Sequence, residues 1–292
     1  MHSGKKMGKA TDEGGISLNK YISSTGFCSR RDADEYIRQK RVTINGKIAS
    51  LGSRVGTGDK IAIDGELVKQ KTNNRSVYIA LNKPVGITST TDTKDKTNII
   101  SFLNYPKRIF PIGRLDKDSD GLILLTNDGD IVNKILRAEN NHEKEYIVTV
   151  DKAITPDFVI KMSNGLPILG TTTNNCFVKQ EGSRKFRIIL TQGLNRQIRR
   201  MCEYLGYEVK KLTRIRIMNI ELGTLPIGKW RHLNNDEITT IEKQIATNTN
   251  KIAKEPVQKQ VTIQKTAIIK DKEQVKSVEK KQRSYKDWRN KR

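Results

Sequence analysis

The sequence predicts an α+β protein with a small N-terminal unit and a larger domain built on a twisted, mainly antiparallel mixed sheet. Three observations support this fold class. The chain has 292 residues, enough for one large domain and one small one. The pair Asn45-Gly46 lies between two β-prone runs, which is a strong hairpin signal because both turn residues must reach positive φ. Beyond residue 77, β-prone segments alternate with short helical ones.

The N-terminal unit is expected to span residues 15–67 and to contain two short helices and a small sheet. Ser17 is a candidate cap for a helix over "LNKYISSTG". Ser29 and Asp32 have the spacing of a capping box at the start of "RRDADEYIRQK". The segments "VTINGKIA" and "GDKIAIDGE" then supply short strands and turns. Residues 1–14 are small, polar and basic, and we expect a disordered leader there.

A polar linker at residues 68–76 leads to the larger domain, which is expected over residues 77–242. Its β-prone segments include "GLILLTN", "EYIVTV", "KFRIILT" and "LTRIRIMNIEL". In "RIRI" a period of two predicts that Arg214 and Arg216 face water while the isoleucines face a core.

The C-terminal segment, residues 243–292, is expected to be a disordered basic tail. Residues 246–292 hold 14 Lys or Arg against 5 Asp or Glu, with few aromatic residues. Such a segment cannot bury enough apolar surface to offset the entropy of ordering it. One interpretation is that the tail adds a non-specific, salt-sensitive attraction to nucleic acid. The alternative is that the tail is a solvating segment with no binding role.

The formal net charge of +23 is the strongest signal in the composition. Such a surplus destabilises a compact chain through self-repulsion and favours a polyanionic partner. An acidic membrane surface is the alternative to nucleic acid. The sequence has no basic helix with a broad apolar face, and only 5% of its residues are aromatic. Nucleic acid is therefore the favoured partner.

The cysteines and histidines do not form a metal-binding pattern. Cys28, Cys176 and Cys202 are far apart and odd in number, and the three histidines are scattered. We expect free thiols in a reducing cytoplasm. No apolar run approaches the roughly 20 residues that a membrane helix needs. We therefore expect a cytoplasmic protein that is neither exported nor integral to a membrane.

The second predicted helix of the N-terminal unit carries a basic cluster formed by Arg30, Arg31, Arg38, Lys40 and Arg41. Taken alone, the cluster could be a solvated helix face. The unit, however, resembles the S4 RNA-binding domain (αL-type), whose pattern is "LxKxI…G…SRxxAxxxIxxGxVxVNGK". The agreeing positions are Leu18, Lys20, Ile22, Gly26, Ser29, Arg30, Ala33, Ile37, Val42, Asn45, Gly46 and Lys47. This resemblance implies that the basic face grips structured RNA through its phosphates and shape.

The stretch "GRLDKDSDGLILLTNDGD" at residues 113–130 allows three interpretations of Asp116: a calcium ligand, a catalytic carboxylate or a turn residue. The first half of an EF-hand loop is present, but Asn127 replaces the bidentate Glu that completes the coordination shell. Pro111 and Gly113 also lie where an entering helix would be required. No metal site is therefore predicted. Asp118 and Asp120 are interpreted as turn residues.

The same stretch resembles the signature of the RNA pseudouridine synthases, in the branch of the small- and large-subunit rRNA enzymes. Every fixed position of G-R-L-D-x-x-[ST]-x-G-L-[LI]-[LIF]-[LF]-T-N-D-G is met. "LNKPVGITST", "KEYIVTV" and "LTQGLNRQIRRMCEYLGYEVKKLTRIRI" match further family segments in order, the last most similar to the large-subunit synthase F subfamily. The resemblance, S4 unit included, covers roughly residues 16–240 and implies a reaction that needs no cofactor.

The resemblance implies three catalytic residues: Asp116, Tyr146 and Arg199. Asp116 would be the essential carboxylate, acting at the sugar as a nucleophile or as an ion-pairing base. Tyr146 would stack on the target base. On a helical wheel Arg199 lies about 100° from Ile198, beside the apolar stripe, and so is the arginine best placed to be half-buried near the carboxylate. Asn195 is the candidate cap of that helix.

Further residues are candidates for positioning RNA or the carboxylate loop: Lys83, Arg114, Asn195 and Arg196. The resemblance implies an enzyme acting on a uridine of 23S rRNA near the peptidyl-transferase region, with a tRNA anticodon loop as a second substrate. For the oligomeric state we take a monomer as the default. The main alternative is an S4-bearing ribosome-assembly factor that binds RNA without catalysis. A glycosidase using Asp116 is more distant, because it leaves the RNA-binding unit unexplained.

Overall fold

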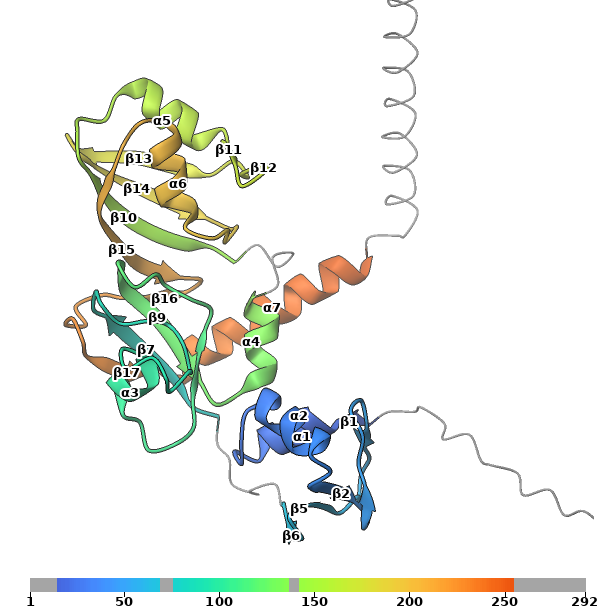
Figure 1. Ribbon diagram of the computed structural model, residues 1–292. Helices are drawn as coiled ribbons and strands as arrows, with labels where there is room; N and C mark the ends of the chain where they lie inside the picture. Colours follow the sequence, from blue (N-terminus) through green and yellow to red (C-terminus); the bar gives the residue numbers. More distant parts are fainter. Residues whose placement is uncertain (1–14, 69–75, 137–141, 255–292) are drawn as a thin grey trace, which may run out of the picture. The chain divides into compact units, whose positions relative to one another are not determined.

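The computed structural model describes residues 15–68, 76–136 and 142–254. The chain divides into two compact units, one up to Asn234 and one from Asn235 onward (Figure 1). The sequence-based predictions for the leader and for residues 69–75 and 255–292 lie outside the described residues.

The N-terminal S4-like body has two short helices and small sheets. Helix α2 begins with the predicted capping box, in which Ser29 and Asp32 each bond the other's backbone N–H. Ser17 precedes α1, but its side chain makes no capping hydrogen bond, so the predicted role of that side chain is wrong. The elements are β1 (Ile16–Ser17), α1 (Leu18–Ser24), α2 (Arg30–Arg38), β2 (Val42–Ile44), β3 (Lys47–Ile48), β4 (Arg54–Val55), β5 (Ile61–Ile63) and β6 (Glu66–Leu67).

The predicted hairpin at Asn45-Gly46 is confirmed, because β2 and β3 pair antiparallel across it and both turn residues have positive φ. The sheet order is β3-β2-β5-β6, with β1 paired separately to β4. The apolar faces of both helices and the strands pack into one small core. Its buried members are Leu18, Ile22, Ala33, Ile37, Val42, Ala49, Val55, Ile61 and Ile63.

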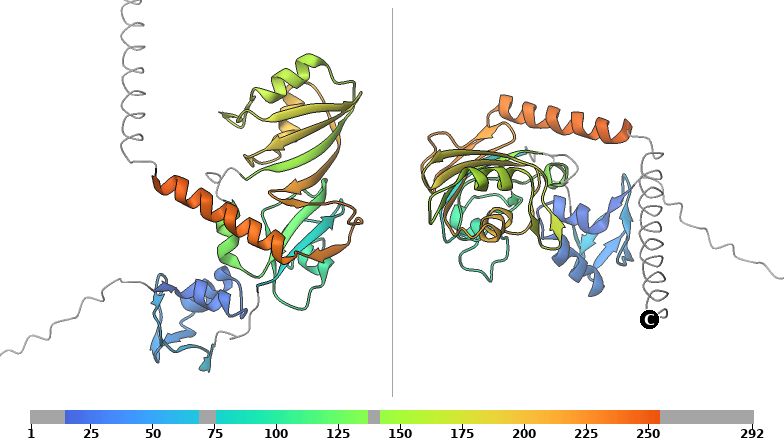
Figure 2. Two further views of the ribbon diagram at one scale, coloured as in Figure 1. Left: turned by 180° about the vertical axis from the view of Figure 1, so that it is seen from behind. Right: turned by 90° about the horizontal axis from the view of Figure 1, so that it is seen from above.

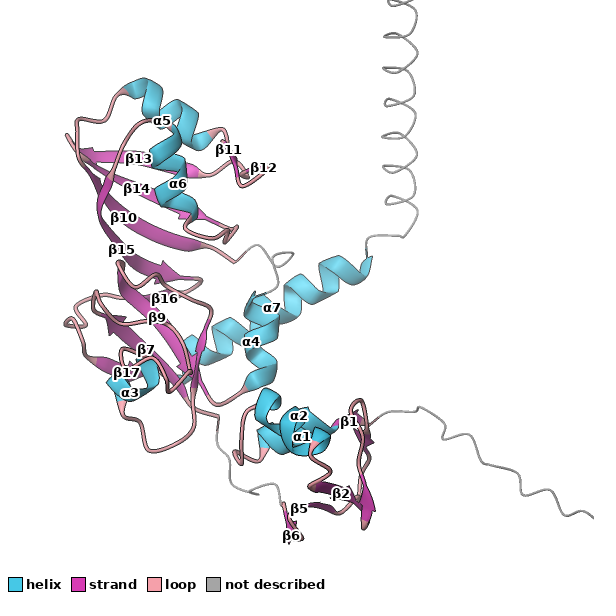
Figure 3. Cartoon of the chain, viewed as in Figure 1, coloured by secondary structure: helices cyan, strands magenta, loops and turns pink. Residues whose placement is uncertain are grey.

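The larger domain is built on a nine-stranded sheet with the path β13-β14-β10-β15-β9-β7-β17, as Figure 3 shows in magenta. Strand β8 pairs with β9 and β16 with β15. The described pairs are antiparallel except β15 with β9, which confirms the predicted α+β class with a mainly antiparallel sheet. The strands are β7 (Tyr78–Lys83), β8 (Phe110–Ile112), β9 (Asp120–Thr126), β10 (Lys144–Val150), β13 (Phe177–Gly182), β14 (Lys185–Leu190), β15 (Val209–Ile217), β16 (Ile220–Glu221) and β17 (Trp230–His232).

Helices pack on this sheet and close its core. In Figures 1 and 2, α5 and α6 cover one face of the part formed by β13, β14 and β10. Phe158 of α5 packs edge-to-face against Phe186 of β14 with ring centroids 5.2 Å apart, and Met201 of α6 is fully buried. The remaining elements are α3 (Ile99–Leu103), α4 (Gly129–Leu136), α5 (Pro156–Ser163), α6 (Gln197–Tyr204) and a hairpin of β11 (Pro167–Ile168) with β12 (Thr171–Thr172).

The parallel pairing of β15 with β9 overturns one prediction. Arg214 is opposite Gly121 in this pair and is only 4% exposed, whereas we predicted that it faces water. Its Nε donates to the carbonyl of Leu122 at 2.6 Å. A side chain at position 121 would collide with the backbone, because an added Cβ would lie 2.3 Å from the Arg214 carbonyl oxygen. Glycine therefore permits the close approach of the two strands.

The second unit contains helix α7 (Asn235–Lys254). Residues 243–254 are therefore helical, and the boundary that we placed at residue 242 lies inside a helix. The pattern overlooked was the apolar spacing of Ile238, Ile241 and Ile245, of which the last two are buried. Asp236 and Glu237 lie in the first turn, where negative charge favours a helix. Within the described ranges, no helix combines the length and apolar character needed to cross a bilayer.

Candidate active site

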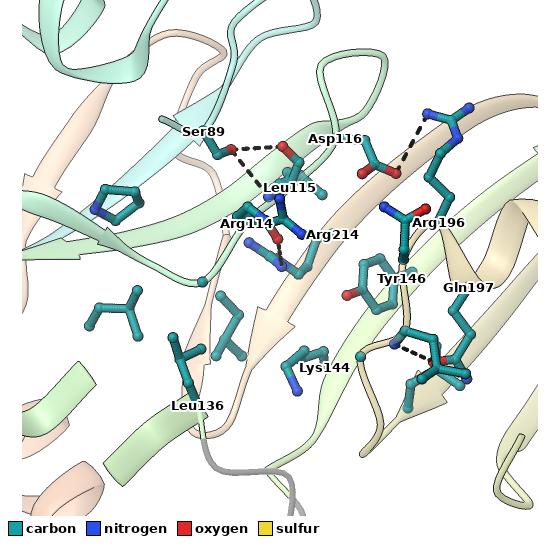
Figure 4. A pocket seen from close by; sticks show the side chains of 18 of the residues that line it. Ser89, Arg114, Leu115, Asp116, Leu136, Lys144, Tyr146, Arg196, Gln197 and Arg214 are labelled. Carbon is teal, nitrogen blue, oxygen red and sulfur yellow. Dashed lines mark hydrogen bonds and ion pairs between the residues drawn. The ribbon is translucent and has the colours of Figure 1, made fainter. Parts of the chain in front are cut away.

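A pocket of about 710 Å³ opens where the loop before β9 meets strands β10 and β15. Asp116, Tyr146 and Arg199 all line it, so the structure brings the three predicted catalytic residues to one cavity. Figure 4 shows Asp116 and Tyr146 on its wall, with Arg196 beside the carboxylate. Arg114, Asn195 and Arg196 also line it.

The loop that carries Asp116 is tied down on both sides. The hydroxyl of Ser89, which is buried, donates to the Leu115 carbonyl at 2.7 Å and accepts from the Leu115 N–H at 3.1 Å. The Gly86 N–H donates to the Lys117 carbonyl at 2.7 Å. Within the loop, Ser119 N–H donates to the Asp116 carbonyl at 3.1 Å. These bonds hold the backbone around Asp116 without occupying its carboxylate.

The arginine that approaches Asp116 is Arg196, not Arg199 as the helical wheel suggested. Arg196 Nη1 lies 3.9 Å from Asp116 Oδ2. Arg196 precedes α6 as its N-cap residue with a left-handed φ of 50°, which corrects the prediction of Asn195 as the cap. The Asn195 carbonyl instead accepts from Arg200 Nε at 3.1 Å. Arg196 reaches the carboxylate because it lies just outside the helix.

Arg199 is half-buried as predicted, with 14% of its side chain exposed, but its partners are Asp118 and Ser119. Its Nε lies 3.3 Å from Asp118 Oδ2, and its Nη2 donates to the Asp118 carbonyl at 2.9 Å and to Ser119 Oγ at 3.2 Å. Its Nη1 donates to the Val209 carbonyl at 3.3 Å. Arg199 therefore connects α6 and β15 to the loop that follows Asp116.

Asp118 lies in a turn, as predicted, but its side chain is also an ion-pair partner, which the prediction missed. It pairs with Arg196 through both oxygens, at 3.1 and 2.9 Å. Partial burial would raise the pKa of Asp118, but the hydrogen bond from Arg196 and the charges of both arginines outweigh this effect and lower it. Asp118 therefore stays ionised at neutral pH and keeps the two guanidinium groups beside the loop.

Asp120 also departs from the turn interpretation. It is the first residue of β9 and is buried, with Lys211 Nζ 3.7 Å from its Oδ2. Among the described residues, no three His, Cys, Asp or Glu side chains are arranged to hold a metal ion.

Two of the Lys and Arg residues that line the pocket were not among the predicted site residues. Arg214, opposite Tyr146 in the β10–β15 pair, lines the pocket, and its Nη1 donates to the Arg114 carbonyl at 3.2 Å. Lys144 lies two residues before Tyr146 on β10 and lines the same cavity. The available signal was alternation along β10, because Lys144 and Tyr146 are on the same face of a strand.

Lys83 was a candidate for contacting RNA or for positioning the carboxylate loop, and its complete burial leaves the second role. Its Nζ donates to the carbonyls of Pro84 and Ile87 at 2.9 and 3.0 Å. It thereby supports the turn from which Gly86 bonds the Asp116 loop. Burial lowers the pKa of Lys83 to about 8, although Asp120 acts against this effect.

The five basic residues of the S4-like body are exposed, as RNA contact would require. Two already have acidic partners. Arg38 pairs with Glu35 at 2.8 Å, and Arg41 pairs with Asp64 at 2.6 Å while its guanidinium lies 4.5 Å from the ring centroid of Tyr36. The others, at positions 30, 31 and 40, extend from the second helix and the turn after it.

Comparisons with known proteins match both the N-terminal unit and the larger domain. The family model described as RNA pseudouridylate synthase matches residues 77–204, and the S4 domain model matches residues 17–61. A crystal structure described as a pseudouridylate synthase superposes with a TM-score of 0.57 at 29% identity, covering 77% of this chain and 99% of the other.

Curated relatives show the same relationship over most of the chain. The dual-specificity RNA pseudouridine synthase RluF of Escherichia coli (strain K12) is 57% identical over 237 residues, or 81% of this chain and 82% of the relative. RluF of Salmonella typhi is 60% identical over 78% of this chain and 79% of its own. Ribosomal large subunit pseudouridine synthase B of Bacillus subtilis is 35% identical over 76% of this chain and 93% of its own. The chain therefore belongs to the RNA pseudouridine synthases, the isomerases that its motifs predicted, and carries an S4 domain ahead of the catalytic domain.

Proposed function

We propose that the chain isomerises a specific uridine of 23S rRNA near the peptidyl-transferase region, with a tRNA anticodon loop as its second substrate. Two of the similar relatives are named dual-specificity enzymes, and the Bacillus relative is named for the large ribosomal subunit. The S4 domain match supports a structured RNA as the ligand. We assign the enzyme to the cytoplasm as a monomer.

The observation that carries this proposal is the position of Asp116. Its carboxylate is 34% exposed on the wall of the pocket, within reach of a ligand, while its backbone is tied down by Ser89 and Gly86. In the reaction the N1–C1′ bond breaks, the uracil turns, and a C5–C1′ bond forms. The C5 proton is then lost and N1 gains one, so that the atoms balance. We assign Asp116 to the sugar, as a nucleophile or as an ion-pairing base.

Tyr146 and the arginines support this step. We assign Tyr146 to stacking on the target uracil, because it lies on the pocket wall opposite Arg214 and beside the Asp116 loop. Arg196 places a positive charge 3.9 Å from the carboxylate and orients it. Arg199 acts as a positioning residue, since it bonds the loop at Asp118 and Ser119.

A stacked uridine must be extruded before it can enter the pocket, at a cost of a few kcal/mol. Phosphate contacts from the basic face of the S4 domain, at Arg30, Arg31 and Lys40, would offset this cost. Affinity for RNA should then fall steeply with salt.

Asp116→Asn tests the proposed chemistry, because the amide preserves size and removes the charge. We expect RNA binding to persist and pseudouridine formation, mapped by sequencing of 23S rRNA and tRNA, to fall by more than about 1,000-fold. Asp157→Asn, on the exposed face of α5, is the matched control and should leave the product unchanged. An unchanged yield in the Asp116 variant would reject the assignment. If the wild-type enzyme formed pseudouridine in neither 23S rRNA nor tRNA, the proposed substrates would be rejected.

A further inference from the structure

The catalytic pocket contains a pair of basic side chains that have no acidic partner within the described part of the chain. Lys144 and Arg214 both line it, and in Figure 4 Lys144 lies on the side of the pocket away from the Asp116–Arg196 pair, toward Leu136. The two residues lie on neighbouring strands, because Lys144 is two residues before Tyr146 on β10 and Tyr146 is opposite Arg214 on β15. Burial lowers the pKa of Lys144, and the positive charge of Arg214 lowers it further.

The hydrogen bonds of this pair go to neutral groups. Lys144 Nζ donates to the carbonyls of His142 and Thr191 at 3.1 and 3.5 Å. Arg214 donates to the carbonyls of Leu122 and Arg114, and its Nη2 has no partner among the described residues. Neither side chain forms an ion pair with a carboxylate in the described ranges.

Two other arginines of the same sheet pair with carboxylates, whereas the buried Lys83 on β7 donates only to carbonyls. Arg216, the neighbour of Arg214 on β15, pairs with Glu143 and Glu145 at 2.9 and 2.6 Å. Arg187 on β14 pairs with Glu145 and Glu181. Arg187 and Arg216 are therefore matched by carboxylates, whereas Lys144 and Arg214 have no such partner among the described residues.

We propose that Lys144, backed by Arg214, binds a backbone phosphate of the RNA next to the flipped uridine. This inference rests on the proposed function, and it assigns a phosphate subsite to the end of the pocket away from Asp116. Lys144 Nζ retains a third N–H to donate, since two are directed at carbonyls. Arg214 is too deeply buried for direct contact and instead adds a second positive charge behind the first.

This arrangement gives the pocket two different ends. A carboxylate at one end acts on the ribose, and a cationic pair at the other holds the phosphodiester, so the nucleotide has one orientation in which both contacts form. The phosphate would also supply the negative charge that Lys144 and Arg214 lack. Lys144 is thus a positioning residue that sets the register of the strand.

Lys144→Gln tests the subsite in the full-length protein, with a synthetic RNA hairpin that contains the mapped target uridine as the probe. Affinity should fall by about tenfold at moderate salt, and the slope of log Kd against log[KCl] should decrease by about 0.7, the value for one lost phosphate contact in a single strand. The loss should fall on KM more than on kcat. Lys144→Arg should restore the slope, and Lys185→Gln, which is exposed on β14 outside the pocket, is the matched control.

A phosphate scan removes any dependence on folding of the variant. Single methylphosphonate substitutions around the target uridine should reveal one position at which the wild-type enzyme loses affinity for the RNA. At that position the substitution should not lower the affinity of the Lys144→Gln variant any further. The proposal would be overturned if Lys144→Gln kept the salt slope of the wild-type enzyme. It would also be overturned if every methylphosphonate substitution lowered the affinity of Lys144→Gln as much as it lowers that of the wild-type enzyme. Either result would point to a contact between Lys144 and the base. Failure of the proposed chemistry would appear separately, as product formation by Asp116→Asn.

Discussion

Arg196 and Asp118, 78 residues apart in the chain, form a two-point ion pair with Nη1–Oδ1 and Nη2–Oδ2 distances of 3.1 and 2.9 Å. The same guanidinium lies 3.9 Å from Asp116. Its partner Asp118 also lies 3.3 Å from Arg199. Asp118, two residues beyond Asp116, therefore holds both arginines beside the loop.

Removing the charge of Asp118 should impair catalysis more than folding. In Asp118→Asn, Arg196 loses its ionic partner, and we expect kcat/KM to fall by about tenfold, or about 1.4 kcal/mol. Both side chains are more than 40% exposed, so the free energy of unfolding should change by less than about 1 kcal/mol. Single-turnover kinetics and urea denaturation measure the two effects. Wild-type kinetics in this variant would show that Asp118 does not position Arg196 for the reaction.

The hydroxyl of Ser89 should be required for the loop geometry. Ser89→Ala leaves the buried N–H and carbonyl of Leu115 without their partner, and we expect a loss of about 1–3 kcal/mol in unfolding free energy. Because Leu115 adjoins Asp116, kcat should also fall. Ser163→Ala is the control, since that hydroxyl donates to the Val159 carbonyl within α5. If both variants retained full kcat, the Ser89 bonds would be structural only.

Gly121 should tolerate no side chain. In Gly121→Ala the new Cβ would lie 2.3 Å from the Arg214 carbonyl oxygen, at a φ of +105°, and the loss in unfolding free energy should exceed about 3 kcal/mol. Gly170→Ala is a matched control, because its φ is +73° with nothing within 4 Å of the added atom. That change should cost only about 1 kcal/mol. Equal melting temperatures of the two variants in thermal denaturation would contradict the close approach of β9 and β15.

Lys83 should make stability depend on pH in alkaline solution. Burial lowers its folded pKa to about 8 from an ordinary value of 10.5, so between these pH values the unfolded chain binds a proton that the folded chain lacks. Unfolding free energy should therefore rise with pH in this window, relative to Lys83→Met. Urea titrations of both proteins from about pH 7 to about pH 10 measure the difference. A constant difference would show that Lys83 keeps its ordinary pKa, and Lys185→Met should show no such trend.

Local sequence signals determined much of the architecture. The capping box of Ser29 and Asp32 and the Asn45-Gly46 turn are formed as predicted, because each depends on residues within a few positions of one another. The signature around Asp116 likewise singled out a loop that lines the pocket. The apolar face of α6 at Ile198 and Met201 is buried as its spacing indicated.

Tertiary structure decided which charged groups meet. The period-two alternation of β15 predicted that Arg214 is exposed to solvent. Parallel pairing with β9 instead buries Arg214 and brings it to the carbonyl of Leu122, 92 residues away in the chain. The helical wheel selected Arg199 for Asp116, whereas the left-handed backbone at Arg196 directs that arginine to the carboxylate instead. The periodic pattern of apolar residues in a helix or strand indicates only which of its faces is apolar. The partner of each charge depends on the strands and loops that pack against it, and those contacts are set by the whole fold.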